Sequence, residues 1–256
     1  MSSHKSHLAN LYYDEQMDLG EATRADKRYM LATVPRSGST YCALRMWRSG
    51  ALGAPMEYLN FRASGRLLKR LGYGGDIGGT DLSSYWEKVM SLRTTANGVF
   101  GFKMFTSNYV DIAKRAPLFL STLKPNYVIY LTREDELGQV ISYSKAIRSK
   151  VWFADVPNTP IVEYDYEHIC WCMRLIKQQK LAWERAFAVT GVLPLRVTYE
   201  SFLSSEQSVL SAIKSYLDIS RRQFKAINIP LISRQADHSS IDWREQFIRD
   251  ARLLGS

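Results

Sequence analysis

A run of small and charged residues holds the first candidate chemistry: Pro35-Arg36-Ser37-Gly38-Ser39-Thr40. It follows an apolar stretch (29–34) typical of a buried strand and precedes apolar residues at helical spacing (41–47). A strand, a small-residue turn and a helix can bind phosphate, because unpaired N–H groups of the helix point at the anion. Gly38 permits close approach of the backbone, Arg36 supplies a charged donor, and the serines and the threonine supply hydroxyls. An ordinary serine-capped helix fits this local pattern equally well.

A second candidate anion site begins at Arg133, directly after the apolar stretch Tyr127–Thr132. Ser142 lies nine residues later, in a predicted helix. An arginine at the end of a strand and a serine about two to three turns into the next helix can reach one phosphate together. The alternative is a surface salt bridge of Arg133 with Asp135 or Glu136, which the residues alone favour.

The elements that must position these residues alternate between strands and helices. This alternation indicates an α/β fold with a central parallel sheet flanked by helices. Strands are predicted at 29–34, 99–105, 127–132 and 195–198. Helices are predicted at 41–47, 81–95, 108–123 with a break near Pro117, 134–150, 164–190 ending at Gly191, 204–217 with a capping box at 204–207, and 242–254, while 51–80 is predicted to be a long, glycine-rich, partly irregular insertion. Ligands bind such sheets at the carboxyl ends of the strands, so Arg36 and Arg133 are expected on one edge.

The length and charge of the chain limit the functions it can have. Its 256 residues suit one large domain or two small ones, and we expect a polar arm at 1–28, loosely attached, before a single domain at 29–256. The net charge of +9 suits a nucleic acid, an acidic membrane surface or an anionic small molecule as partner. Because the basic residues are dispersed, they favour an enzyme that attracts an anionic cofactor.

The cysteines and the apolar runs indicate the compartment. Cys42, Cys170 and Cys172 are odd in number and lack a framework spacing, which predicts a reducing, cytoplasmic location. No apolar run approaches the length of a membrane span, and no signal peptide opens the sequence. No histidine pair completes a site with the cysteines, so zinc is disfavoured.

Residues 34–40, Val-Pro-Arg-Ser-Gly-Ser-Thr, resemble the 5′-phosphosulfate loop of sulfotransferases that use 3′-phosphoadenosine 5′-phosphosulfate (PAPS). The Arg-Ser-Gly-Ser-Thr form is similar to that of the bacterial trehalose 2-sulfotransferase family. Four further segments resemble this family in the same order: Gly53-Ala54-Pro55-Met56-Glu57-Tyr58, Asn97-Gly98-Val99-Phe100-Gly101-Phe102-Lys103, residues 133–142, and Arg234-Gln235-Ala236 with Asp242-Trp243. The ordered set spans most of the chain.

The resemblance implies a P-loop-like sulfotransferase fold and a reaction. The sulfuryl group of PAPS would move in line to a hydroxyl of a carbohydrate or glycolipid acceptor, trehalose-like or a cell-surface glycan, with a glutamate base and release of 3′,5′-ADP. No metal is expected, because arginines, hydroxyls and amides meet the charges of the cofactor. The resemblance also implies a homodimer, with no nucleic acid as partner and no stable membrane insertion.

The resemblance assigns roles to individual residues. Catalytic roles fall to Glu57 as the base and to Arg36 and Lys103 as charged donors. Cofactor binding falls to Arg36, Ser37, Gly38, Ser39 and Thr40 at the 5′ end, to Arg133 and Ser142 at the 3′-phosphate, to Tyr199 near the adenine, and to Arg234 and Gln235 in a loop that closes over the cofactor. The alternative for Glu57, Lys103 and Arg234 is an exposed surface charge with no role in the reaction.

Two residues depart from the family pattern, and two other functions compete with this one. Ala54 replaces the first glutamate and Phe100 replaces a tryptophan, so the acceptor differs from trehalose if that glutamate contributes to trehalose binding. A P-loop kinase-like phosphotransferase is disfavoured, because no Gly-Lys-[Ser/Thr] follows a first glycine and no clear acidic metal ligand follows a strand. A basic RNA- or membrane-binding protein would show a steep loss of affinity with salt.

Overall fold

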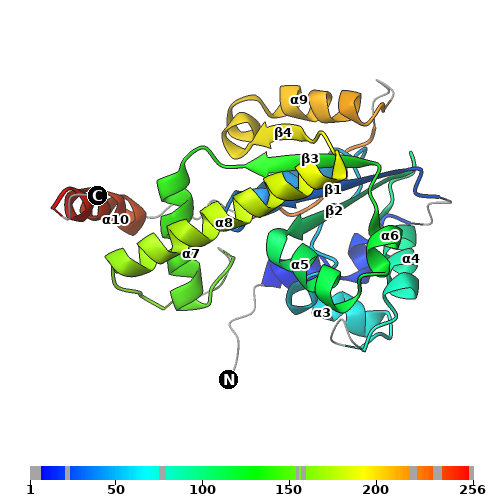
Figure 1. Ribbon diagram of the computed structural model, residues 1–256. Helices are drawn as coiled ribbons and strands as arrows, with labels where there is room; N and C mark the ends of the chain where they lie inside the picture. Colours follow the sequence, from blue (N-terminus) through cyan, green and yellow to red (C-terminus); the bar gives the residue numbers. More distant parts are fainter. Residues whose placement is uncertain are drawn as a thin grey trace.

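The sheet that positions the candidate site consists, within the described residues, of four parallel strands in the order β2-β1-β3-β4 (Figure 1). They are β1 (Lys27–Thr33), β2 (Val99–Phe105), β3 (Tyr127–Thr132) and β4 (Leu195–Thr198). The computed structural model describes residues 7–20, 24–74, 79–153, 156, 160–219, 224–232 and 238–253. Strands β1 to β3 are apolar and mostly buried, as expected of parallel strands covered on both faces. The predicted α/β fold with a central parallel sheet is confirmed.

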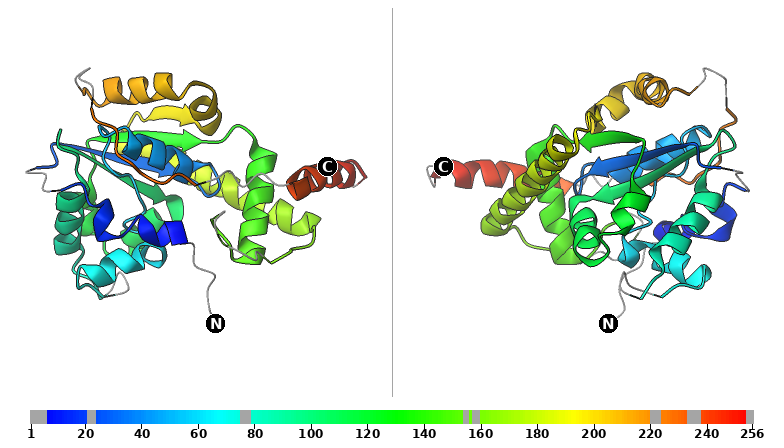
Figure 2. Two further views of the ribbon diagram at one scale, coloured as in Figure 1. Left: turned by 180° about the vertical axis from the view of Figure 1, so that it is seen from behind. Right: turned by 45° about the vertical axis from the view of Figure 1, so that its right-hand side comes forward.

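Helices cover both faces of this sheet. In the described residues they are α1 (His7–Leu11), a short 3-10 helix η1 (Glu15–Met17), α2 (Ser39–Arg48), α3 (Phe61–Arg70), α4 (Leu82–Arg93), α5 (Thr106–Arg115), α6 (Phe119–Leu123), α7 (Glu136–Ser149), α8 (Tyr166–Thr190), α9 (Tyr199–Tyr216) and α10 (His238–Leu253). Helix α8 crosses one face (Figure 1), and α2 lies on the other, seen from behind in Figure 2. Trp183 of α8 donates from Nε1 to the Thr33 carbonyl at 2.8 Å, which ties this helix to the end of β1.

One region refines the sequence prediction and another differs from it. Helix α3 occupies part of the insertion at 51–80, which was expected to be partly irregular. The predicted capping box at 204–207 is wrong, because α9 begins directly after β4. Thr198 and Ser201 form the box instead, with the Ser201 amide donating to Thr198 Oγ1 at 3.1 Å and the Thr198 amide donating to Ser201 Oγ at 3.3 Å. A kink at Ser205, with φ −148° and ψ 51°, divides α9 into two helical segments, and the second begins near the helix start that the sequence predicted.

The N-terminal segment 7–20 packs against the rest of the chain, which differs from the loose attachment that its polarity suggested. Tyr12 and Tyr13 are buried, and the Tyr12 hydroxyl donates to the Pro230 carbonyl at 2.8 Å. Arg93 of α4 is fully buried, donates to three backbone carbonyls of the segment and pairs with Asp18 at 3.0 Å. A buried guanidinium needs such acceptors, so the segment completes the core around α4.

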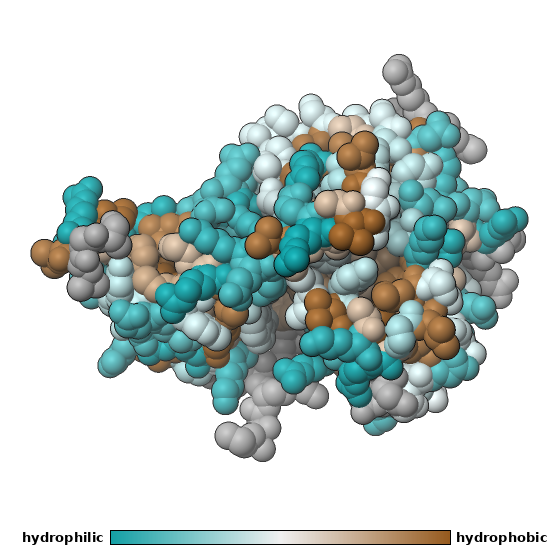
Figure 3. Space-filling model, viewed as in Figure 1, coloured by the Kyte–Doolittle hydropathy of each residue, from teal (hydrophilic) through white to brown (hydrophobic). Residues whose placement is uncertain are grey.

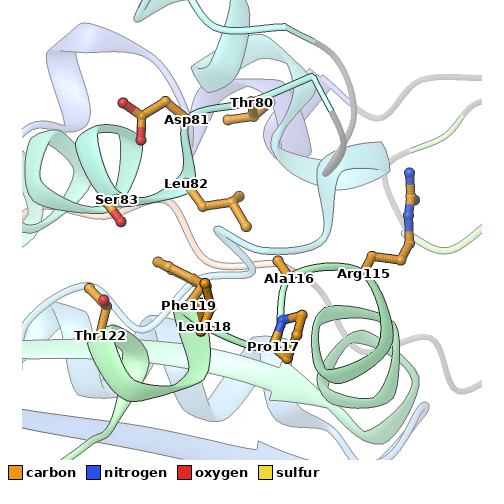
Figure 4. Close-up of a pocket in the computed structure, with 10 residues that line it drawn as sticks. All are labelled: Thr80, Asp81, Leu82, Ser83, Arg115, Ala116, Pro117, Leu118, Phe119 and Thr122. Atoms are coloured by element: carbon orange, nitrogen blue, oxygen red, sulfur yellow. The ribbon is translucent and has the colours of Figure 1, made fainter.

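The surface in the view of Figure 3 is mostly hydrophilic, with hydrophobic atoms gathered over α5 and α6. Leu118, between these helices, is 88% exposed. Leu118 is one of the residues that line a pocket of about 580 Å³ between the start of α4 and the α5–α6 region. Figure 4 shows the side chains that line this pocket. None of its lining residues is a predicted site residue. No helix in the described part of the chain is both long and apolar enough to cross a membrane.

Candidate active site

The predicted phosphate loop leaves β1 at the carboxyl edge of the sheet and enters α2 at Ser39. Gly38 occupies the N-cap position with φ 76°, and a Cβ there would lie 2.2 Å from a ring carbon of Tyr199. Only glycine fits such a position. Arg36 also has a positive φ, 60°, a conformation that is uncommon for other residues and concentrates at functional sites. Helix α2 is therefore preceded by a specialised turn rather than by a serine cap.

Buried side chains of β1 and α7 hold this loop in place. Ser37 Oγ lies 2.6 Å from Thr33 Oγ1, which donates to the Leu131 carbonyl at 2.9 Å. Gln139 of α7 donates from Nε2 to the Pro35 carbonyl at 2.7 Å. Sequence reasoning missed Thr33 and Gln139, since nothing near the loop marks a contact with a residue 104 positions away.

Two arginines meet at the loop. Arg36 donates from Nε to Ser142 Oγ at 2.8 Å and from an NH1 group to the Trp152 carbonyl at 2.8 Å. Arg133 donates to the Arg36 carbonyl at 3.4 Å. Burial, and then the positive charge of Arg133, lower the pKa of Arg36 to about 10. Two partly buried like charges repel each other, so an anion between them would be strongly favoured.

Arg133 also forms the salt bridge that was its alternative role. Its NH2 group lies 3.0 Å from Asp135 Oδ2, while its guanidinium carbon lies 5.7 Å from the centre of the Tyr199 ring. Its Nε is buried and has no hydrogen-bond partner among the residues that the structure describes. Ser142 contacts Arg36 rather than Arg133. Arg133 and Ser142 were expected to share one phosphate, but each of them contacts Arg36 instead. The Nε of Arg133 remains as an unsatisfied buried donor.

Asp135 joins this arginine cluster to α10. Arg244 of α10 donates to Asp135 Oδ1, and the Gly138 amide donates to the same oxygen at 3.0 Å. Burial works against ionisation of Asp135, but the bonds from Arg244, Gly138 and Arg133 outweigh it and hold the pKa of Asp135 below its ordinary value. The carboxylate therefore remains a charged junction between α7 and α10.

Tyr199 and Glu200 fix the start of α9 against the loop. The Tyr199 ring packs against Gly38 and meets Tyr41 edge to face, with centroids 6.0 Å apart. Glu200 accepts from the Glu134 amide at 3.0 Å and from the Asp135 amide at 3.4 Å. This segment therefore braces both the phosphate loop and the turn that carries Arg133.

On the other side of the loop, Lys103 links the candidate base to the start of α2. Its Nζ lies 2.9 Å from Glu57 Oε1 and donates to Thr40 Oγ1 at 2.9 Å. The Lys103 side chain is fully buried, and that of Glu57 is 13% exposed. Neither residue is the exposed surface charge that was the alternative. The structure brings the carboxylate, the ammonium and the loop together within hydrogen-bond distances.

The segment that carries Glu57 runs beside β2. Gly53 has φ 66°, and a Cβ there would lie 2.7 Å from the Gly101 amide nitrogen. Met56 forms a parallel bridge with Phe102, and its carbonyl accepts from the Lys103 amide at 2.9 Å. This pairing places Glu57 next to the Lys103 side chain at the carboxyl end of β2.

Sequence reasoning missed two neighbours of Glu57. Asn60 donates from Nδ2 to Glu57 Oε2 at 2.7 Å. Tyr13 faces the same residue from the N-terminal segment: burial, and then the negative charge of Glu57, raise the pKa of Tyr13 well above its ordinary value. The Glu-x-x-Asn spacing was the one signal that could have pointed to Asn60.

Comparison with known proteins decides between the candidate functions. The profile of the Stf0 sulphotransferase family matches residues 28–250. The chain belongs to this family. Two trehalose 2-sulfotransferases are similar to this sulfotransferase: that of Mycobacterium tuberculosis (strain ATCC 35801 / TMC 107 / Erdman), 23% identical over 91% of this chain and 98% of the relative, and that of Mycolicibacterium smegmatis (strain ATCC 700084 / mc(2)155), 24% identical over 89% and 96%. The predicted sulfotransferase class is confirmed over the kinase-like and binding-protein alternatives.

Two solved structures also resemble this sulfotransferase. The sulfotransferase domain from the curacin biosynthetic pathway is 17% identical, with a TM-score of 0.44 over 78% of this chain and 76% of that chain. The sulfotransferase from Alicyclobacillus acidocaldarius is 10% identical, with a TM-score of 0.45 over 89% of this chain and 94% of that chain.

Two predicted site residues and the two departures from the family pattern remain to be placed in this sulfotransferase. Arg234 and Gln235 lie outside the described residues. Ala54 is fully buried, and its carbonyl accepts from the Tyr58 hydroxyl. Phe100 is buried between Tyr58 and Trp86. Both departures from the family pattern are therefore core positions in this chain.

Proposed function

We propose that this sulfotransferase moves the sulfuryl group of PAPS to a hydroxyl of a carbohydrate or glycolipid acceptor. The observation that carries the proposal is the Glu57–Lys103–Thr40 contact, with 2.9 Å on each side of the Lys103 ammonium. Through the Lys103 side chain, the Glu57 carboxylate is linked to Thr40 in the first turn of α2, the helix that follows the phosphate loop. A base and an anion site must be this close for transfer from a bound donor.

The donor set of the loop fits the charges of PAPS, which supplies the activated sulfuryl group when bound and leaves as 3′,5′-ADP. We assign the 5′ end to Arg36, Ser37, Gly38, Ser39 and Thr40, the 3′-phosphate to Arg133 and Ser142, and the adenine side to Tyr199. The adjacent guanidiniums and the unsatisfied Arg133 Nε support this assignment. Arg234 and Gln235 are proposed to close over the cofactor. No metal is part of the proposal.

Each polar residue near the base has a distinct task. Glu57 accepts the proton of the acceptor hydroxyl as the new oxygen–sulfur bond forms. Lys103 and Arg36 stabilise negative charge that develops on the oxygens around the sulfur. Positioning and electrostatic stabilisation of this kind dominate the related phosphoryl transfers, and we carry that logic over by analogy.

The acceptor is proposed to be a trehalose-like sugar or a cell-surface glycan. Both similar proteins named above are trehalose 2-sulfotransferases. Ala54 is buried, so selection among these acceptors is assigned to other residues. We further propose a single domain that includes the packed segment 7–20 in addition to the expected 29–256, a homodimer, and a cytoplasmic location, the last from the odd number of unpaired cysteines.

Thermal unfolding with 3′,5′-ADP, 5′-AMP and ATP with magnesium tests the cofactor. A ligand of the folded state stabilises it by RT ln(1 + [L]/Kd), about 2.7 kcal/mol at a hundredfold excess over Kd. Only 3′,5′-ADP is expected to raise Tm, and Arg133→Ala is expected to abolish the rise. Equal stabilisation by ATP and magnesium would contradict the cofactor assignment. Turnover of PAPS with trehalose by Glu57→Gln tests the base, and full activity would exclude it.

A further inference from the structure

Asn60 occupies the N-cap position of α3 without capping the helix through its side chain. Its carbonyl accepts from the Ala63 and Ser64 amides, both at 2.8 Å, and from Ser64 Oγ at 3.1 Å. The residue is therefore fixed by the first turn of the helix. Asparagine is among the best N-cap residues because its side-chain oxygen normally accepts from the second or third amide of the helix. At Asn60 that bond is missing.

Four helices of the described structure use their N-cap side chains in the ordinary way. Asp81 of α4 accepts from the Ser84 amide at 3.2 Å, and Asp135, Asp165 and Thr198 likewise cap α7, α8 and α9. The N-cap residues of α2, α5 and α6 have no side chain that can cap, and the N-cap aspartate of the short η1 also leaves this bond unmade. Among the described α-helices with a capping type of residue at the N-cap, α3 is therefore the exception. A capping side chain turned away from its helix, next to the proposed base, points to a functional constraint there.

The Asn60 side chain is directed to Glu57 instead. Its Nδ2 donates to Oε2 at 2.7 Å, while Lys103 holds Oε1 at 2.9 Å. Donors on both oxygens fix the rotation of the carboxylate and leave its remaining lone pairs to face an acceptor. The Asn60 amide also donates to the Glu57 carbonyl at 3.1 Å, so backbone and side chain of the two residues form one compact turn.

We propose that Asn60 is a positioning residue for the base, giving up the cap of α3 to orient the Glu57 carboxylate. The inference rests on the proposed role of Glu57. The Asn60 side chain donates to the Glu57 carboxylate, so in this proposal it acts through that carboxylate rather than on the reacting atoms. Its loss is expected to lower turnover without weakening the binding of 3′,5′-ADP, which the opposite side of the loop is proposed to hold.

The surroundings of Glu57 give the proposal a signature that needs no acceptor. In the described structure the titratable groups that face it are Lys103 from β2 and Tyr13 from the N-terminal segment. Asn60 is the neutral donor beside them. Removing this donor takes a hydrogen bond from Oε2 and so changes the electronic surroundings of the carboxylate directly. A merely structural role of Asn60 would not produce this change.

Asn60→Ala and Asp81→Ala form a matched pair of N-cap variants. Asp81 lies at the start of α4, beside the cavity of Figure 4 and away from the loop. We expect Asn60→Ala to lower kcat with PAPS and trehalose by about tenfold, the value of one hydrogen bond to a charged group, and to lower Tm no more than Asp81→Ala does. We expect Asp81→Ala to lower Tm and to keep kcat.

Carbon-13 NMR of the glutamate carboxyl groups gives a readout that needs no acceptor. The Glu57 signal is identified by its loss in Glu57→Gln. In Asn60→Ala at neutral pH its chemical shift is expected to move away from the wild-type position, because Oε2 loses its donor. In Asp81→Ala the signal is expected to keep the wild-type position. Asn60→Asp can cap α3 and places a negative charge beside Glu57 in place of the donor, so it is expected to move the signal as well. It serves as the test variant if Asn60→Ala does not fold.

A wild-type position of the Glu57 signal in both Asn60 variants would overturn the inference. A loss of Tm in Asn60→Ala larger than that in Asp81→Ala, with the Glu57 signal unchanged, would also overturn it. The failure of the proposed function has a different signature. If Glu57→Gln keeps full turnover, Glu57 is not the base. The NMR signal then still reports whether Asn60 contacts this carboxylate, while the catalytic part of the inference falls with the base.

Discussion

The Tyr199 ring lies directly against Gly38, so closely that a Cβ at residue 38 would lie 2.2 Å from a ring carbon. Gly38→Ala must therefore displace the ring or the loop, in addition to straining φ 76°. We expect the affinity for 3′,5′-ADP to fall by about tenfold or more, equivalent to about 1.4 kcal/mol or more. Titration calorimetry with 3′,5′-ADP measures the change.

Gly191→Ala is the control for this prediction. Gly191 caps α8 with φ 67°, and a Cβ there meets nothing within 4 Å. This variant has the same kind of backbone strain, about 1 kcal/mol, without the contact. It is expected to lower Tm and to keep the affinity for 3′,5′-ADP. Equal loss of affinity in both variants would show that strain, and not the Tyr199 contact, makes residue 38 sensitive.

Ser142→Ala is expected to weaken the binding of 3′,5′-ADP by about tenfold, because Arg36 loses the acceptor that directs its Nε at 2.8 Å. Ser144→Ala, two residues further along α7, removes a buried contact of 2.8 Å with His168 Nδ1. That variant is expected to lower Tm only. Calorimetry and thermal unfolding of both proteins separate the two effects, and an unchanged affinity in Ser142→Ala would refute the assignment.

Arg93→Met is expected to destabilise the fold by about 3 kcal/mol or more, because it leaves buried carbonyls and Asp18 without their partner. Arg66→Met, which breaks an exposed pair with Asp14, is expected to cost less than about 1 kcal/mol. Urea unfolding measures both values. Limited proteolysis should cut the N-terminal segment first in Arg93→Met, and equal stability of the two variants would contradict the role of the segment in the core.

Acid stability is expected to depend on Asp135. Its pKa is below the ordinary value because the bonds from Arg244, the Gly138 amide and Arg133 outweigh the effect of burial. Its contribution is therefore complete above the unfolded value of about 3.9 and is lost as the pH falls through the lowered folded value. Asp135→Asn should lose less Tm than the wild type on acidification from pH 5 to about pH 3.

Glu184→Gln is the control for Asp135→Asn, because it removes another carboxylate with a lowered pKa at a different place in the fold. The hydrogen bonds from Arg196 likewise lower the pKa of Glu184, but that pair lies away from α10. Hydrogen exchange at neutral pH should therefore accelerate in α10 for Asp135→Asn and remain unchanged there for Glu184→Gln. Wild-type protection of α10 in Asp135→Asn would show that the Arg244 contact does not hold this helix.

The elements of the sheet edge could be predicted because their signals are local. Strands β2, β3 and β4 have the bounds that their apolar runs predict. Gly191 ends α8 as expected. In each case the deciding interaction lies within a few residues of the signal, so periodicity and turn chemistry suffice.

The contacts around the base could not be predicted in the same way. The Glu57–Lys103 pair joins residues far apart in sequence, and its distance depends on how residues 53–57 lie along β2. Ser142 was expected to serve Arg133, but the rotation of α7 turns it to Arg36. The N-terminal segment looked like a polar arm because two tyrosines among polar residues give no periodic pattern, although both are buried.

The hydrogen bond between the Tyr12 hydroxyl and the Pro230 carbonyl can form only late in the synthesis of the chain. It joins residues 218 positions apart. At synthesis rates of about 5–20 residues per second, the partner of Tyr12 emerges roughly 10–40 seconds after it. Arg93, which donates to three carbonyls of the N-terminal segment, is synthesised much earlier than Pro230. The N-terminal segment is thus made first, is held early at one side by α4, and is secured at the other side only when translation is almost finished.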